Sequence, residues 1–109
     1  MLTGHNKISD INILEKVKLK ELKELYLYEN KISDIKVLEK VKFAKLEILN
    51  LSENQISDIN ILEKVNFKEL KELYLGSNKI SDIKVLEKVK FDKRKITFGK
   101  KSKKKKINL

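Results

Sequence analysis

Residues 22–32 read LKELYLYENKI, residues 46–56 read LEILNLSENQI, and residues 70–80 read LKELYLGSNKI. Each stretch begins 24 positions after the one before it. Agreement of this kind at a fixed period indicates a repeat architecture, in which units stack because none can bury its apolar face alone. We therefore predict a solenoid of three complete units with degenerate units at both ends.

Each unit carries a strand signal followed by a helix signal. Leu25 and Leu27 alternate with outward-facing residues, and this period of two predicts a strand. From Ile35 onward, apolar residues recur every three positions, which predicts a short helix that is at least partly 3₁₀. Ser33 or Asp34 is the expected N-cap of that helix. The expected core of one unit consists of Leu22, Leu25, Leu27, Ile32, Ile35, Leu38, Val41 and Phe43.

An asparagine recurs every 24 residues and, in the three complete units, follows the predicted strand. The four copies are Asn6, Asn30, Asn54 and Asn78. An inward-pointing turn side chain must satisfy backbone groups of the adjacent coils, and an asparagine amide supplies both a donor and an acceptor. We therefore interpret this column as a structural ladder and not as a ligand site.

The three strand phrases match the pattern LxxLxLxxNxI, and each is followed by ISDI and LEKV. Over residues 6–91 the chain resembles the leucine-rich-repeat family, in particular the bacterial internalins and the phosphatase-regulatory type of repeat. The resemblance implies an α/β solenoid with a parallel concave sheet and short convex helices or 3₁₀ turns. It also implies a role in binding a protein partner of unknown identity.

Both ends depart from the pattern. We assign residues 1–98 to the solenoid, with a degraded fourth strand at about Lys95–Phe98, and residues 99–109 to a disordered lysine-rich tail. Neither end shows the polar capping structure that a solenoid normally needs, so we expect self-association through the ends. One hypothesis is that the chain is a partial fragment of a longer array without independent function.

The positive charge is concentrated near the C-terminus. The chain has a net charge of +10, and residues 92–109, with nine Lys or Arg against one Asp, contribute +8 of it. An alternative function is therefore attachment of the tail to nucleic acid or another anionic surface, weakly and with steep salt dependence. The lysines expected to carry it are Lys100, Lys101, Lys103, Lys104, Lys105 and Lys106.

Several kinds of chemistry have no support in the sequence. The chain has no cysteine, which excludes disulfides and thiolate chemistry, and its single histidine is His5. A column of Ser-Asp pairs could attract calcium, but helix capping explains it with fewer assumptions. We predict no catalytic residues, no metal, no cofactor and no enzymatic activity. The pairs are Ser9-Asp10, Ser33-Asp34, Ser57-Asp58 and Ser81-Asp82.

No apolar run reaches the roughly 18–20 residues of a membrane span, and no signal peptide is visible at the N-terminus. These observations predict a cytoplasmic protein without a membrane span. The lysine run makes a nuclear location the alternative.

The outward-facing strand positions differ between units, whereas the buried ones barely change, and this favours partner binding through the concave sheet. Five glutamates against two lysines give that side a net charge of −3, which favours a basic partner or docking of the chain's own tail. Four strands span less than about 20 Å. A sheet of this size is too small for tight binding by itself. Either loops join the interface, or the complex is weak, or the binding surface belongs to a longer array. The predicted partner-binding residues are Glu24, Tyr26, Tyr28, Ile48, Asn50, Glu72 and Tyr74.

Overall fold

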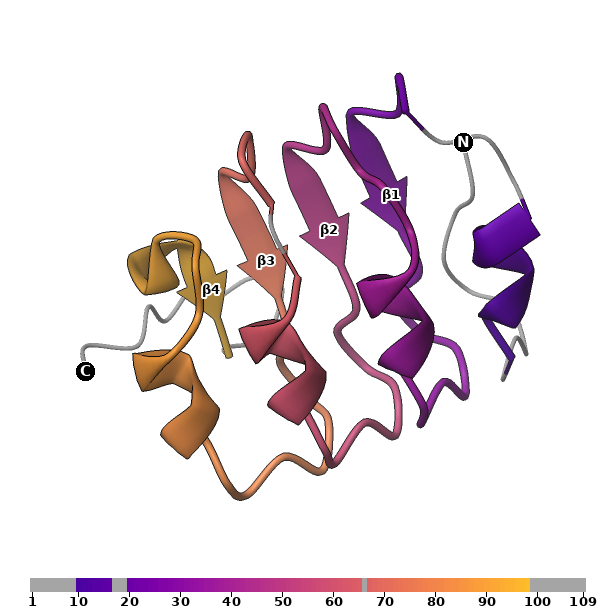
Figure 1. Ribbon diagram of the computed structural model, residues 1–109. Helices are drawn as coiled ribbons and strands as arrows, with labels where there is room; N and C mark the ends of the chain where they lie inside the picture. Colours follow the sequence, from indigo (N-terminus) through magenta and orange to yellow (C-terminus); the bar gives the residue numbers. More distant parts are fainter. Residues whose placement is uncertain (1–9, 17–19, 66, 99–109) are drawn as a thin grey trace.

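A computed structural model describes residues 10–16, 20–65 and 67–98 of the chain. Its strands form one parallel sheet in chain order (Figure 1). The predicted solenoid with a parallel sheet is confirmed. The strands are β1 (Glu24–Tyr26), β2 (Ile48–Asn50), β3 (Glu72–Tyr74) and β4 (Ile96–Thr97).

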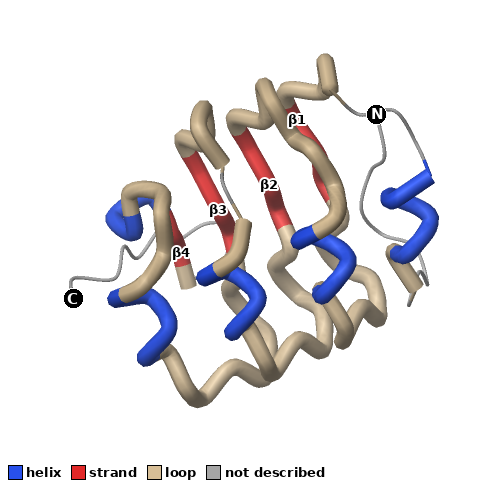
Figure 2. Tube along the Cα trace, viewed as in Figure 1, coloured by secondary structure: helices blue, strands red, loops and turns tan. Residues whose placement is uncertain are grey.

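A row of short helices lies opposite the sheet, one in each coil (Figure 2). Within the described ranges every helix is a 3₁₀ helix, in keeping with the apolar spacing of three that begins at Ile35. In η2 the amide of Leu38 donates to the carbonyl of Ile35 at 3.1 Å, and Lys40 donates to Val37 at 2.9 Å. The four successive helices are η1 (Asn12–Lys16), η2 (Lys36–Glu39), η3 (Asn60–Glu63) and η4 (Lys84–Glu87).

The 24-residue period sets the strand register. Leu25 is aligned with Leu49, and Leu49 with Leu73, so equivalent residues of successive units stack directly. The next step is one residue shorter, because Leu73 is aligned with Ile96. The prediction of a fourth strand after one deletion therefore placed the strand correctly.

β4 is shorter than the predicted Lys95–Phe98. Residues Lys93–Lys95 form a further 3₁₀ turn, η5, immediately before it. The Asp92 carboxylate accepts a hydrogen bond from the amide of Arg94 at 3.0 Å, and the amide of Lys95 donates to the carbonyl of Asp92 at 3.0 Å. These local bonds hold Lys95 in the turn and delay the start of the strand.

The core lies between the sheet and the helices. Its strand leucines are completely buried. Three successive coils each add a phenylalanine to a column of rings, with 6.1 Å between the centroids of Phe43 and Phe67 and 5.6 Å between those of Phe67 and Phe91. Two predicted core residues, Leu22 and Val41, are only half-buried. Val37, which the spacing of three did not include, is buried instead.

The expected helix cap takes a different form. The Asp34 carboxylate accepts a hydrogen bond from the amide of Lys36 at 2.9 Å, and Asp10, Asp58 and Asp82 make the same contact in their own coils. However, Ile35 occupies the N-cap position, and its side chain makes no capping bond. The aspartate therefore supports the turn from one residue before the cap, and serine does not serve as the cap.

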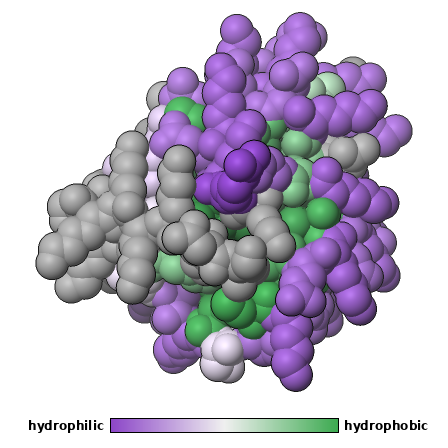
Figure 3. Space-filling view, turned by 90° about the vertical axis from the view of Figure 1, so that its left-hand side faces the viewer, coloured by the Kyte–Doolittle hydropathy of each residue, from purple (hydrophilic) through white to green (hydrophobic). Residues whose placement is uncertain are grey.

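The coil nearest β4 is less covered than the inner coils. Ile32 and Ile56 are fully buried, whereas their equivalent Ile80 is half-buried. Seen from the β4 end, a hydrophobic area is framed by hydrophilic residues (Figure 3). The next coil lies against the inner isoleucines: Asn54 accepts a hydrogen bond from the amide of Ile32 at 3.1 Å, and the amide of Gln55 donates to the carbonyl of Ile32 at 2.8 Å.

Candidate functional site

We use the term sheet face for the outward-facing residues of β1, β2 and β3 together with Tyr28, which follows β1. These are the seven residues predicted to bind a partner. Pleating sends Leu25 and Leu73 inward, so Glu24, Tyr26 and their counterparts on β3 lie on the outer side. The structure thus brings the predicted residues together on one surface of the solenoid.

Two equivalent tyrosine–glutamate pairs dominate the sheet face. The Tyr26 hydroxyl donates to the Glu24 carboxylate at 2.7 Å. The Tyr74 hydroxyl donates to the Glu72 carboxylate in the same way. These bonds were not predicted from the sequence, although the spacing of two within ELY places both side chains on one face. Each pair fixes an aromatic ring beside a negative charge.

β2 lies between the two pairs and presents different chemistry. Ile48 is aligned with Glu24 and Glu72, and Asn50 with Tyr26 and Tyr74. Ile48 is half-buried, whereas Asn50 is 7% exposed. We call the outer surface of Ile48 and Asn50 the central strip.

The Asn50 side chain is turned toward Ser52, two residues further along the same coil. Its side-chain oxygen accepts a hydrogen bond from the amide of Ser52 at 3.0 Å and a second one from the Ser52 hydroxyl. Ser52 itself is buried. Of the seven predicted residues, Asn50 therefore offers little surface to a partner, and Ile48 supplies most of what the central strip exposes.

Tyr28 extends the aromatic surface beyond the end of β1. Its ring meets that of Tyr26 edge to face, with the centroids 6.4 Å apart and an interplanar angle of 85°. Both tyrosines are half-buried. This arrangement is one of the preferred geometries of aromatic pairs, and it restricts both rings before any partner arrives.

The electrostatic environment of Tyr26 shows that the two pairs influence one another. The hydrogen bond to Glu24 raises the pKa of the Tyr26 hydroxyl to about 12, with smaller contributions from burial and from the charges of Glu24, Glu72 and Tyr74. The last two groups lie two strands away, on β3. The charge of Glu72 therefore contributes to the environment of the Tyr26 hydroxyl across the central strip.

Ion pairs beside the sheet link successive coils. Lys71 lies 3.4 Å from the carboxylate of Glu47. Lys45 donates to Glu21 at 2.8 Å, and this bond lowers the pKa of the Glu21 carboxyl and raises the pKa of the Lys45 ammonium. Both pairs are accessible to solvent and contribute little to stability.

The asparagine column makes backbone contacts that hold the coils together. The Asn54 amide group donates to the carbonyls of Leu27 and Leu51 at 3.0 Å and to that of Ser52 at 3.1 Å. Its oxygen accepts from the amide of Ile32 at 3.1 Å. Asn78 repeats this set one coil later, and Asn30 bonds to the carbonyls of its own coil. Asn6 lies outside the described residues.

The Ser-Asp column lies on the helical side. Two neighbouring pairs, Ser33-Asp34 and Ser57-Asp58, line a hollow there. The aspartates already accept backbone hydrogen bonds, as described above. In the part of the chain that the structure describes, no group of three or more His, Cys, Asp or Glu side chains could hold a metal ion. His5 and Ser9 lie outside that part.

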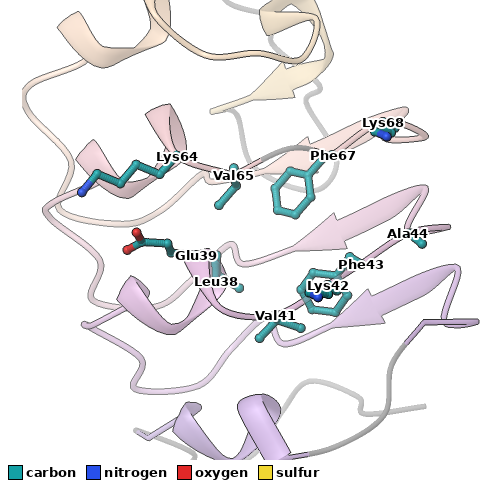
Figure 4. Close-up of a pocket in the computed structure, with 10 residues that line it drawn as sticks. All are labelled: Leu38, Glu39, Val41, Lys42, Phe43, Ala44, Lys64, Val65, Phe67 and Lys68. Carbon is teal, nitrogen blue, oxygen red and sulfur yellow. The ribbon is translucent and has the colours of Figure 1, made fainter.

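A second hollow opens where two coils meet between the helices and the following strands (Figure 4). Phe43 and Phe67 line it, and both rings are 4% exposed, so its floor is the core itself. Charged residues also line the hollow, namely Glu39, Lys42, Lys64 and Lys68. The hollow is an indentation between repeats.

No helix among the described residues is both long and apolar enough to cross a membrane. The six tail lysines predicted to contact nucleic acid lie outside the described residues.

Comparison with known proteins agrees with the geometry. The family model described as leucine-rich repeats in two copies matches residues 2–40 and 44–88. This chain belongs to the leucine-rich-repeat family. Proteins built from this repeat are typically non-enzymatic scaffolds that bind other proteins. No curated protein matches the chain.

Among solved structures, the leucine-rich-repeat chain is similar to an internalin from Listeria monocytogenes. The two share 34% sequence identity with a TM-score of 0.65, over 86% of this chain. The match covers 25% of the internalin chain, so this chain spans about a quarter of that protein's length. The resemblance to internalins predicted from ISDI and LEKV is confirmed.

Proposed function

We propose that this chain is a protein-interaction module that binds its partner through the sheet face. The observation that carries the proposal is the pair of identical tyrosine–glutamate units, which stand two strands apart on an otherwise regular solenoid. Tyrosine supplies large contact area at low cost in conformational entropy, and it is enriched among residues that dominate binding energy.

The residues assigned to this interface are the seven of the sheet face, with Tyr26, Tyr28 and Tyr74 as aromatic anchors and Glu24 and Glu72 as charge selectors. Ordered rings favour this role, because Tyr26 is held both by its hydrogen bond to Glu24 and by its edge-to-face contact with Tyr28. A ring that is already restricted loses less freedom on binding.

The area of the face sets the expected strength of binding. Strands of two or three residues at a spacing of about 4.8 Å give a few hundred Å², compared with about 800 Å² per partner in a standard interface. We expect binding by these strands alone to be weak, and a tight complex to recruit the neighbouring loops or further repeats.

Site-specific photo-crosslinking tests the surface. A photoreactive residue at Tyr26 or Tyr74 should form adducts with the partner, whereas one at Lys40 or Lys88, on the helical side, should not. Equal labelling from both sides would contradict the proposal. With the partner in hand, joint replacement of Tyr26 and Tyr74 by alanine should weaken binding by at least about thirtyfold, the effect of losing about 2 kcal/mol.

The second candidate function is attachment of the lysine tail to nucleic acid or an anionic surface, and the +8 charge of residues 92–109 supports it. The tyrosine double variant separates the two functions. It should lose the protein partner and keep its affinity for a polyanion, since neither tyrosine belongs to the tail.

A further inference from the structure

The sheet face combines two features that together define a class of partner. The two outer strands, β1 and β3, each carry a negative charge and an aromatic ring at aligned positions of the sheet. These residues are Glu24 with Tyr26 on β1 and Glu72 with Tyr74 on β3. The central strip between them carries no charge. At a strand spacing of about 4.8 Å, the two outer strands are about 10 Å apart.

We propose that the central strip receives a lysine or arginine side chain from an extended basic segment of the partner protein. This inference rests on the proposed function, since it requires the sheet face to be the interface.

A long basic side chain has an apolar stem and a cationic head, and the central strip with its neighbouring glutamates can contact both. The apolar stem would lie over Ile48, which is half-buried and aligned with both glutamates. The cationic head would lie between the Glu24 and Glu72 carboxylates. A carboxylate has about four acceptor sites, so it can accept hydrogen bonds from a tyrosine and from a cation at the same time.

The tyrosine rings add a second attraction for the same group. A cation over an aromatic face gains about 0.5–1 kcal/mol at an exposed site. Because Tyr26 and Tyr74 are each bonded to a glutamate, ring and carboxylate are held as one unit. A neutral or acidic side chain at the same position would gain neither contact.

The charge around the strip agrees with this choice. Five glutamates and two lysines lie on or beside strands β1 to β3, for a net charge of −3, and one of these lysines, Lys71, is paired with Glu47. Lys95, just before β4, donates to the carbonyl of Leu70 at 3.1 Å. The proximity of Glu72 and Tyr74 to Tyr26 is also visible in the raised pKa of the Tyr26 hydroxyl. A positively charged segment is therefore attracted to the whole face, and electrostatic complementarity mainly improves specificity and association rate.

A peptide titration of the full-length chain tests the proposal. The probe is a short peptide of alternating lysine and serine, which in extended form presents its lysines on one side. Matched peptides with glutamine or glutamate in place of lysine serve as comparisons. We expect the lysine peptide to bind at least about tenfold more tightly than the glutamine peptide.

Two matched charge variants distinguish a specific site from general attraction. The double variant Glu24→Gln, Glu72→Gln should weaken lysine-peptide binding about tenfold. The control Glu39→Gln, Glu87→Gln removes the same charge from exposed positions on η2 and η4, also two coils apart, and should change it less than about twofold. Equal losses in both double variants would overturn the proposal.

The remaining outcomes are also decisive. If photo-crosslinking captures the partner at Tyr26 and the glutamine peptide binds as well as the lysine peptide, the interface stands and the cation preference fails. If neither peptide binds and the crosslinks come from the helical side, the proposed function itself fails. Replacement of the six tail lysines by glutamine should leave lysine-peptide affinity unchanged, whereas a large gain would assign the strip to the chain's own tail.

Discussion

Asn54 shows at the scale of a single residue how one side chain joins two coils. It is 7% exposed, it donates to carbonyls of its own and the preceding coil, and it accepts from the amide of Ile32. Removing it would leave buried backbone groups without partners, and each such group costs about 1–3 kcal/mol.

Asn54→Ala should therefore lower the free energy of unfolding by at least about 3 kcal/mol, as measured by urea denaturation. The control is Asn60→Ala, because Asn60 is exposed on η3, and its loss should stay within about 0.5 kcal/mol. Similar losses at both positions would show that the ladder bonds contribute little. Partner specificity should be unaffected, since Asn54 does not belong to the sheet face.

Tyr26 offers a test of the site by pH. Its pKa is raised from 10.0 to about 12, so its hydroxyl should remain protonated where an ordinary tyrosine ionises. Ultraviolet absorbance of tyrosinate during an alkaline titration measures this, and the Tyr26→Phe variant identifies the contribution. Glu24→Ala should move the transition back toward 10, because it removes the acceptor of the hydrogen bond that is the largest cause of the shift. An unchanged transition would contradict the hydrogen bond.

The same shift has a consequence for stability. The folded state holds the Tyr26 proton more strongly than the unfolded state, in which the pKa is ordinary. The stabilisation is therefore fully present below about pH 10 and is lost as the pH rises through about 12. The Tyr26→Phe variant should lack this part of the alkaline loss.

At the scale of elements, the phenylalanine column connects the coils behind the sheet. Phe67 contacts rings on both sides, whereas Phe91, within the described residues, contacts only that of Phe67. The column follows the 24-residue period, so each ring serves as the packing surface for the ring of the next coil.

Phe67→Ala should cost about 3–5 kcal/mol of unfolding free energy, and Phe91→Ala should cost less, because its ring is already more exposed at 9%. Chemical denaturation of both variants measures the difference. A loss at Phe91 equal to that at Phe67 would mean that the β4 end is packed as tightly as the inner coils.

At the scale of the whole molecule, two regions of opposite charge share one chain. The sheet side has a net charge of −3, and residues 92–109 have a charge of +8. Two different classes of ligand are therefore expected to bind to different parts of the chain, and ionic strength should separate them.

Binding of the full chain to duplex DNA should weaken steeply with salt. Six tail lysines would give a slope of up to about −5 in a plot of log binding constant against log salt concentration. Replacing them by glutamine should remove most of this slope, and Tyr26→Ala should leave it unchanged. DNA binding that survives about 0.3 M salt would contradict a purely electrostatic tail.

The repeat made much of this molecule predictable from sequence. The period of 24, the alternation at Leu25 and Leu27, and the recurring asparagine specify stacked parallel strands, because buried positions must coincide from coil to coil. Asparagine at the end of each strand phrase is explained by the backbone groups that it must satisfy. The placement of Glu24 and Tyr26 on one face follows from pleating alone.

Other features depended on the tertiary structure, because they are set by neighbours that a local pattern does not encode. Asn50 was predicted as a contact residue, yet it lies between Tyr26 and Tyr74 of the neighbouring strands and is nearly buried. Ile80 has the same sequence context as Ile32 but lacks its full burial, since burial depends on what stacks against each coil. Sequence thus determined which residues face outward, and packing between coils decided which of them present surface to a partner.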